Sequence, residues 1–274
     1  MRYTKQSCTY IFKNFFYIFP LTILPAFLLS LSTDEVAIRC LIETIVGGNL
    51  SNLHFEHIFR AISVLNFGSL ESVIFGLLSI IGIIVFVALL MAFLEKHMRI
   101  GKRTLNGLFS KLNDNFMSTT CVVFIFLAVY ELWALLVTAL LFVATCIPMT
   151  LIAYILGGIV YVLMHVVLIY AISTIYLWLP CMQITGFRLL EALGYSYQLV
   201  SSIQWKILLG QLFFLFTTET AMALCVVFAP STPVFTAVTT ALFVVLIMIF
   251  CVRMEIVYFD RDNIERADVK RFGK

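Results

Sequence analysis

The dominant pattern of this chain is a repetition of long apolar runs separated by short polar segments. Six of these runs are long enough to cross a bilayer as a helix, because about 20 apolar residues span the hydrocarbon core. They cover residues 14–31, 70–94, 119–147, 149–179, 206–229 and 234–257. The pattern predicts an all-α fold, a polytopic transmembrane bundle of six helices that forms a single integral membrane domain over residues 1–274.

The connections between the runs differ in length. The turns "CIPMT" and "APSTP" predict tight hairpins between the third and fourth spans and between the fifth and sixth. Residues 32–69 form a long external loop, in which "DEVAIRCLIETIV" and "HFEHIFRAISVLNF" each show one apolar face. This spacing predicts two short amphipathic helices at the outer surface of the membrane. Residues 258–274 are expected to form a solvated tail.

Amphipathic segments also precede the spans that run outward. "RTLNGLFSKLNDNFMSTT" precedes the third span, "GFRLLEALGYSYQLVSSIQWK" precedes the fifth, and "YTKQSCTYIFKNFF" before the first is a degenerate copy. The pattern predicts three hairpins, each with an in-plane amphipathic helix. In the second segment Phe187, Leu190, Leu193 and Tyr197 share the apolar face. Within the first span, Pro20 and Pro25 are expected to kink the helix.

The distribution of basic residues predicts the orientation of the bundle. If the N-terminus is cytoplasmic, that side of the membrane holds 16 of the 18 lysines and arginines, and only Arg39 and Arg60 lie outside. Cytoplasmic loops are enriched in basic residues in membrane proteins. We therefore expect a multi-pass protein of a cell membrane with both termini in the cytoplasm.

The composition supports a membrane location and excludes several other classes. Hydrophobic residues make up 62% of the chain and charged residues only 12%, about half the charged share of a soluble domain. The chain lacks a basic stripe with interleaved aromatic residues, so the sequence does not indicate a nucleic-acid partner. The seven cysteines form no CxxC pair, which argues against a disulfide framework or a zinc site. His54 and His57 alone are too few ligands for a metal site, so no metal or other cofactor is expected.

Three ionisable residues lie deep within the predicted spans and are the candidate intramembrane polar or ion site. They are Glu131 in the third span, His165 in the fourth and Glu219 in the fifth. An acidic side chain near the bilayer centre costs about 2.5–3.5 kcal/mol to insert, so such residues usually face the interior of a bundle. We expect the three side chains to meet there.

Two interpretations of this cluster are open. In the first, a protonated glutamate hydrogen-bonds to a neighbouring span and holds the helices together. In the second, the acids and the histidine form a proton or cation site on a transport route. The first fits a membrane-organising protein that binds lipid or other membrane proteins, with a dry packed interior. The second fits a small ion-coupled carrier with a wet polar cavity.

The chain contains no recognisable catalytic motif. It lacks HExxH, GxSxG and a Walker loop, and its serines are not accompanied by a histidine and an aspartate in a catalytic arrangement. We therefore expect no enzymatic activity, and the expected partners are the lipid bilayer and other membrane proteins.

Three stretches of the chain carry a resemblance to a known family. They are "GKRTLNGLFSKLNDNF", "LWLPCMQITGFRLLEALGYSYQLVSSIQWKILLG" and "VLIMIFCVRMEIVY". In these stretches and in its overall arrangement of spans the chain resembles the YciC-like family of bacterial inner-membrane proteins. More distantly it is similar to the membrane domain fused to some glycerophosphodiester phosphodiesterases. The resemblance implies the fold and a location in a bacterial plasma membrane, and it supplies no substrate or catalytic residue.

Overall fold

A computed structural model describes residues 2–48, 50, 53–65, 68–228 and 231–270. The last residue of the fifth predicted span, parts of the external loop and the end of the predicted tail lie outside these ranges. The described residues form helices joined by short connections, with no strand among them. The helices are α1 (Arg2–Ser32), α2 (Glu35–Val46), α3 (Phe55–Ile62), α4 (Leu70–Ile100), α5 (Leu108–Thr145), α6 (Thr150–Thr174), α7 (Trp178–Thr185), α8 (Leu189–Ser201), α9 (Gln204–Phe228), α10 (Thr232–Arg261) and α11 (Ala267–Lys270).

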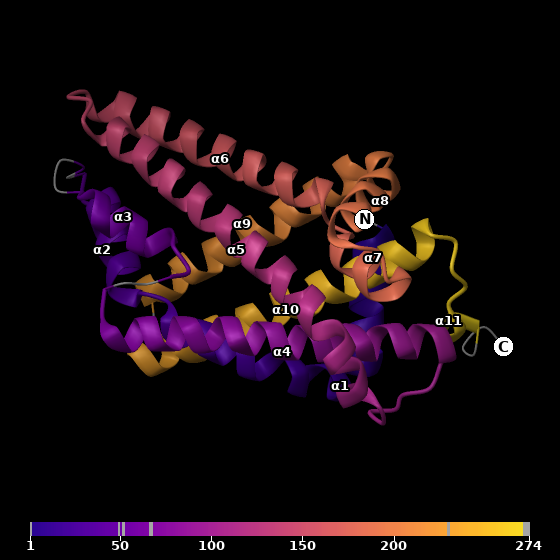
Figure 1. Cartoon of the computed structure of the whole chain (residues 1–274). Coiled ribbons are helices and arrows are strands. Elements are labelled where there is room, and N and C mark those ends of the chain that lie inside the picture. The colour runs from indigo at the N-terminus through magenta and orange to yellow at the C-terminus, as the bar shows by residue number, and fades with distance from the viewer. Residues whose placement is uncertain (1, 49, 51–52, 66–67, 229–230, 271–274) are drawn as a thin grey trace.

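The predicted all-α class and the number of spans are confirmed. Six helical segments are long and apolar enough to cross a membrane: α1, α4, α5, the pair α6–α7, α9 and α10. They mark the chain as a multi-pass membrane protein. Because the number of spans is even, the two ends of the chain lie at the same end of the bundle, with α7, α8 and α11 (Figure 1).

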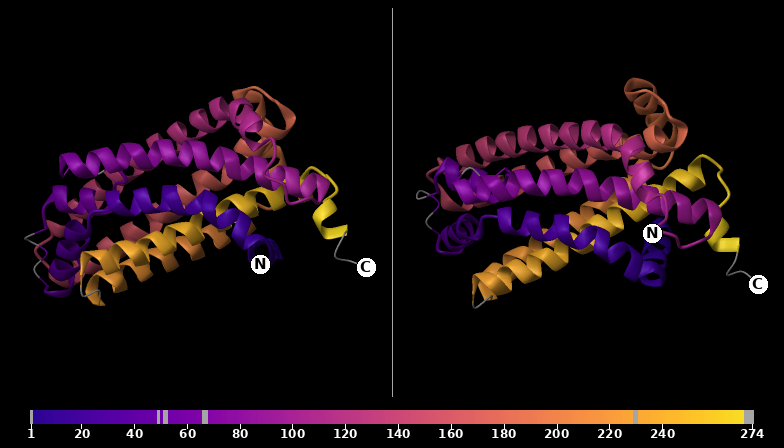
Figure 2. Two further views of the ribbon diagram at one scale, coloured as in Figure 1. Left: turned by 90° about the horizontal axis from the view of Figure 1, so that it is seen from below. Right: turned by 60° about the horizontal axis from the view of Figure 1, so that its bottom comes forward.

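The spans form two groups. Helices α1, α4 and α10 pack closely against one another, and α5 packs against α6 as a second pair (Figures 1 and 2). Helix α4 also contacts α5, whereas α9 bridges from α6 to α10. At the end opposite the termini, α2 contacts α9 and α3 contacts α5, so this helical pair lies in the opening between the two groups (Figure 1).

Small and polar residues bring the first group together. Gly82 of α4 lies so close to α1 that an added methyl carbon would sit 3.4 Å from the Leu28 side chain and 3.6 Å from the Pro25 backbone. On the other side of α1, the Ser30 hydroxyl donates to the Thr236 carbonyl of α10 at 2.9 Å. Close approach over small residues and hydrogen bonds between helices are the main sources of helix association in lipid.

Glycines end two of the helices. Gly101 and Gly186 have φ values of +70° and +73°, the left-handed conformation that glycine adopts without a steric penalty, and they follow α4 and α7 respectively. The predicted fourth span does not run unbroken to residue 179. Helix α6 ends at Thr174, and α7 begins at Trp178 with Pro180 in its first turn, where proline removes no intrahelical hydrogen bond.

The first span also bends at a different place from the one expected. The non-helical residue within α1 is Asn14, not Pro20 or Pro25. The Asn14 side-chain amide donates to the Tyr10 carbonyl at 2.9 Å, which offers that carbonyl a donor other than the helical backbone. The bend leaves the first turns of α1 at an angle to the span (Figure 2).

The expected in-plane helices are found in part. The helix expected after Gly186 is confirmed as α8, but it buries Ala192, Ser196 and Val200 against the bundle and leaves Leu190 76% exposed. The segment before the third span forms no separate helix, because α5 runs without a break from Leu108 into the span.

Candidate functional site

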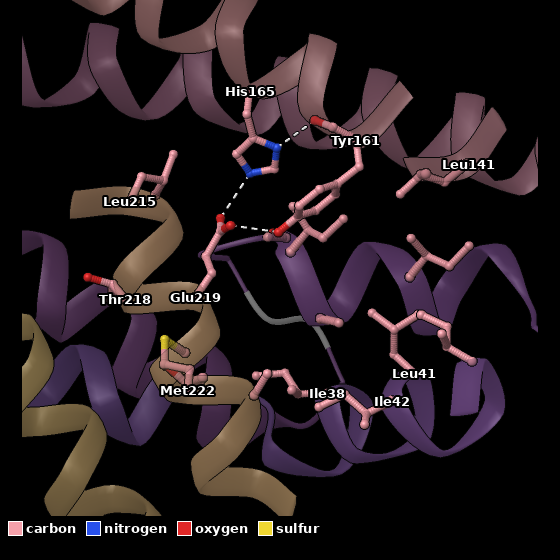
Figure 3. A pocket seen from close by; sticks show the side chains of 18 of the residues that line it. Ile38, Leu41, Ile42, Leu141, Tyr161, His165, Leu215, Thr218, Glu219 and Met222 are labelled. Carbon is pink, nitrogen blue, oxygen red and sulfur yellow. Dashed lines mark hydrogen bonds and ion pairs between the residues drawn. The ribbon is translucent and has the colours of Figure 1, made fainter. Parts of the chain in front are cut away.

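A cavity of about 560 Å³ lies between the two groups of spans. Its walls come from α5, α6, α9 and α10, and the α2–α3 pair closes it at one end. Aliphatic side chains make up most of the lining, including Ile38, Leu41 and Ile42 of α2 and Leu215 and Met222 of α9 (Figure 3). Among the described residues that line it, Glu219 is the one carboxylate.

Glu219 lies in this cavity together with His165 and Tyr161 of α6 (Figure 3). The Tyr161 hydroxyl donates to Glu219 Oε2 at 2.6 Å, and His165 Nε2 lies 2.9 Å from Glu219 Oε1. The His165 ring is buried, at 1% exposed, whereas the Glu219 side chain is 31% exposed. Two spans are thus joined by a carboxyl group that still reaches open space.

The hydrogen bonds of His165 determine how many protons the cluster holds. Its Nδ1 lies 2.8 Å from the Tyr161 carbonyl, and a carbonyl oxygen can only accept, so Nδ1 carries a proton. One further proton lies between Nε2 and the Glu219 carboxyl group. The pair is either an imidazolium with a carboxylate or a neutral imidazole with a carboxylic acid. Its net charge is zero in both states, which is what a low-dielectric site tolerates best.

The positions of the cluster that remain free are acceptors. Glu219 Oε2 accepts from the Tyr161 hydroxyl, and Glu219 Oε1 shares a proton with His165. Each of these two oxygens keeps a second lone pair, and the Tyr161 oxygen also keeps a lone pair. Both nitrogens of His165 are engaged. A molecule in the cavity would therefore bind this cluster best through a hydrogen-bond donor, such as an amine or a hydroxyl group.

Glu131 does not join this cluster, contrary to the expectation that all three ionisable residues meet. Its Oε1 accepts from the backbone N–H groups of Val64 and Leu65, both at 3.0 Å, and its Oε2 accepts from the Ser63 hydroxyl at 2.7 Å. The adjacent Tyr130 hydroxyl donates to the Ile62 carbonyl at 2.8 Å. Glu131 and Tyr130 thus fix the end of α3 to α5. The Glu131 carboxyl group accepts from backbone N–H groups that follow α3 and form no helical hydrogen bond.

Three further contacts hold the α2–α3 pair in the opening of the cavity. Asp34 caps α2 by accepting from the Ala37 N–H at 2.9 Å, and it also binds two nitrogens of Arg60 on α3 at 2.6 and 2.9 Å. The hydrogen bonds that Arg60 donates to Asp34 raise the pKa of Arg60. On the other side, the Tyr154 hydroxyl of α6 donates to the Ile45 carbonyl at the end of α2. The two predicted helices exist, and their inner faces line the cavity.

Trp133 of α5 supports the histidine from behind. Its indole N–H donates to the Met164 carbonyl at 2.7 Å, and its ring meets the His165 ring edge-on with centroids 4.8 Å apart. Trp133 also lines the cavity, so its indole lies at the wall that carries the polar cluster. The sequence around Glu131 is uniformly apolar and did not indicate that Trp133 packs against His165.

His57 of α3 lies close to His54 and to Cys40 of α2. His57 Nδ1 lies 3.9 Å from the Cys40 sulfur, and the rings of His54 and His57 lie 5.6 Å apart. Within the described ranges, no three histidine, cysteine, aspartate or glutamate side chains are grouped closely enough to hold a metal ion.

Two buried charged residues near the end of α10 were missed in the sequence. Arg253 and Glu255 are both buried, although the sequence analysis counted Arg253 among the 16 basic residues expected on the cytoplasmic side. The apolar run "IMIFCVRMEIVYF" continues beyond both charges, and this was a signal that the packed part of the helix continues too.

Comparison with protein-family models, with curated proteins and with solved structures gives no match. The resemblance to the YciC-like family stays a prediction, and the functional argument rests on the cavity itself.

Proposed function

We propose that this chain is a non-catalytic integral membrane protein that binds a lipid-like molecule in the cavity between α5, α6 and α9. The observation that carries the proposal is the apolar cavity of about 560 Å³ with one polar cluster on its wall. A few fixed polar groups in an apolar pocket of about 300–1,000 Å³ are typical of a small-molecule site. The distribution of basic residues supports a cytoplasmic position for both termini, and the resemblance to a bacterial inner-membrane family supports a bacterial plasma membrane.

The ligand class follows from the chemistry of the lining. The aliphatic walls favour a hydrocarbon body, because burying apolar surface contributes about 25 cal/mol per Å². The free lone pairs of Glu219 and Tyr161 favour an amine or hydroxyl group at one end. In a membrane-organising role, the bundle would bind this molecule, a partner protein or both.

An ion-coupled carrier is the second candidate. The observation in its favour is that Glu219 and His165 share one proton, and that Glu219 is accessible from the cavity. Glu131 is bound to residues 63–65, so the polar cluster that faces the cavity has one carboxyl group and one imidazole. Two residues make a short proton relay, and this favours a binding protein over an ion-coupled carrier.

Calorimetric titration tests the ligand class. The purified protein is titrated with a long-chain primary amine, the corresponding alcohol and an alkane of equal chain length. We expect the amine and the alcohol to bind about tenfold or more tightly than the alkane, since a hydrogen bond to a charged group contributes about 1.5–3 kcal/mol. Equal affinities for all three compounds would refute the proposed role of the cluster.

A matched pair of variants attributes the difference to the cavity. Glu219→Leu removes the acceptor and should abolish the preference for the amine and the alcohol. Glu43→Leu makes the same chemical change at an exposed position of α2 and should leave the preference intact. If both variants lose the preference equally, the donor group does not bind at Glu219.

Flux measurements in liposomes separate the two candidates. When the amine is added under an imposed pH gradient, we expect the same proton movement as in protein-free liposomes, because a lipophilic amine crosses the bilayer by itself. Amine-dependent proton flux in the wild type that disappears in Glu219→Gln would replace the binding proposal with the carrier.

A further inference from the structure

A second and smaller cavity, of about 200 Å³, lies near the end of the bundle that holds the chain termini. It is formed between the first turn of α1, the start of α9 and the last turns of α10. Three of the residues that line it are basic: Arg2, Lys206 and Arg253. The remaining lining residues are Tyr3, Thr4 and Ile203. This cavity shares no residue with the larger one.

Arg253 is the unusual member of this set. The residue is only 3% exposed, and one of its terminal nitrogens donates to the carbonyls of Lys206 at 3.1 Å and Ile207 at 3.3 Å. Its Nε has no hydrogen-bond acceptor among the described residues, and no described carboxylate lies within 4.0 Å of its guanidinium. A buried cation without a counter-ion is strongly unfavourable, so the site lacks a negative charge.

The fold makes room for this guanidinium. A methyl carbon added at Gly210 of α9 would lie 2.5 Å from two nitrogens of Arg253. The absence of a side chain at Gly210 therefore lets the guanidinium lie directly against α9. The arginine is held in a defined place by backbone groups while its charge remains available to the cavity.

The nearby charges leave the site positive. Arg2 is paired with Asp260 at 3.0 Å, and the Tyr3 hydroxyl donates to the same carboxylate at 2.6 Å. Lys206 has no ion pair or hydrogen bond from its ammonium group to any part of the chain that the structure describes. Asp260 thus balances one of the three cations, and the charges of Lys206 and Arg253 are left unbalanced.

We propose that this cavity binds a phosphate-bearing anion. Arginine and lysine side chains together are the usual ligands of phosphate oxygens, and the planar guanidinium matches them geometrically. Basic pockets between transmembrane helices on the cytoplasmic side are suited to anionic lipid headgroups. The neighbouring Trp205 is exposed, as an aromatic residue at the level of the headgroups would be. A lipid headgroup and a soluble phosphate share this chemistry, and experiment separates them.

The test measures the thermal unfolding midpoint of the purified full chain in detergent during three titrations. The additives are phosphatidylglycerol, phosphatidylcholine and inorganic phosphate. We expect phosphatidylglycerol to raise the midpoint more than phosphatidylcholine, whose headgroup carries its own cation, because a ligand of the native state stabilises it by mass action. An equal effect of inorganic phosphate assigns the site to a soluble anion. No effect of either anion overturns the proposal.

Charge variants locate the effect. Lys206→Gln should weaken the apparent affinity for the anion about fivefold, the value of one basic residue at a membrane surface. Lys102→Gln removes the same charge from the exposed connection between α4 and α5 and should leave the affinity unchanged. Equal losses in the two variants would mean that the anion responds to net charge alone and would overturn the site.

A geometric pair makes the test independent of charge. Gly210→Ala displaces the Arg253 guanidinium and should weaken anion binding at constant charge. Gly194→Ala in α8 meets no atom within 4 Å and is the control. If Gly210→Ala folds and binds the anion as well as Gly194→Ala does, Arg253 is not a ligand. If Gly210→Ala does not fold, the Lys206→Gln comparison decides the proposal by itself.

Discussion

At the scale of single residues, Glu219 forms hydrogen bonds with two side chains of another helix and still faces a cavity. The Tyr161 and His165 side chains lie one helical turn apart on α6, so both reach the same carboxyl group. Because the shared proton leaves the pair neutral, the cluster can lie within an apolar bundle at moderate cost. The contribution of Glu219 to stability can therefore be measured separately from any role in proton transfer.

Substitutions at Glu219 test this structural role. Glu219→Gln can still accept from Tyr161 and donate to a neutral His165, so we expect a loss of about 0.5–1.5 kcal/mol in the free energy of unfolding. Glu219→Leu leaves the Tyr161 hydroxyl and His165 Nε2 without a hydrogen-bond partner and should cost about 1–3 kcal/mol more. Chemical denaturation in detergent micelles measures both changes. A leucine variant as stable as the glutamine variant would contradict the hydrogen-bonded geometry.

The sequence predicted the pair of Glu219 and His165 but not the place of Glu131. Polar side chains on two spans are expected to meet, because lipid offers them no other partner. Glu131 obeys the same rule, but its partners are backbone N–H groups of residues 64 and 65, which have no signature in the sequence. Arg253 was assigned to the cytoplasmic side because a basic residue near the end of a span usually marks the boundary.

At the scale of elements, the α2–α3 pair determines whether the cavity is closed. Amphipathic periodicity predicted both helices, but it cannot distinguish a helix on a membrane surface from one that covers an apolar cavity, since both bury one face. The difference lies in long-range contacts: Asp34 with Arg60, Glu131 with residues 63–65, and Tyr154 with Ile45.

Loss of the Glu131 contacts should release this pair. Glu131→Leu leaves the Val64 and Leu65 N–H groups without their acceptor, which costs about 1–3 kcal/mol and should favour local opening about tenfold or more. Maleimide labelling of the native Cys40 on α2, with the other cysteines replaced by alanine, reports the opening. Glu43→Leu on the exposed side of α2 is the control and should label at the wild-type rate. Equal labelling rates in the two variants would show that Glu131 does not hold the pair.

At the scale of the whole molecule, the two ends of the chain lie at one end of the bundle and α2–α3 lie at the other. The number of spans was predictable because each apolar run is long enough to cross a bilayer. The cavity between the two groups of spans was not predictable, since a lipid-facing side and a cavity-facing side of a helix are equally apolar.

The proposed orientation predicts the side from which each end is accessible. In a cysteine-free background, Val46→Cys at the end of α2 should react with a membrane-impermeant maleimide in intact cells. Leu105→Cys, in the connection between α4 and α5, should react only after permeabilisation. The opposite pattern would place the termini outside and contradict the proposed topology.

Fluorescence of Trp133 tests the central claim, that a lipid-like molecule occupies the cavity beside Glu219. The chain has three tryptophans, so a variant with phenylalanine at positions 178 and 205 retains only the indole at the cavity wall. We predict that a brominated long-chain amine quenches this indole with saturation, and that Glu219→Leu raises the concentration for half-saturation about tenfold or more. Quenching that rises linearly with the amine, identically in both proteins, would show partition into the surrounding lipid and would contradict the account.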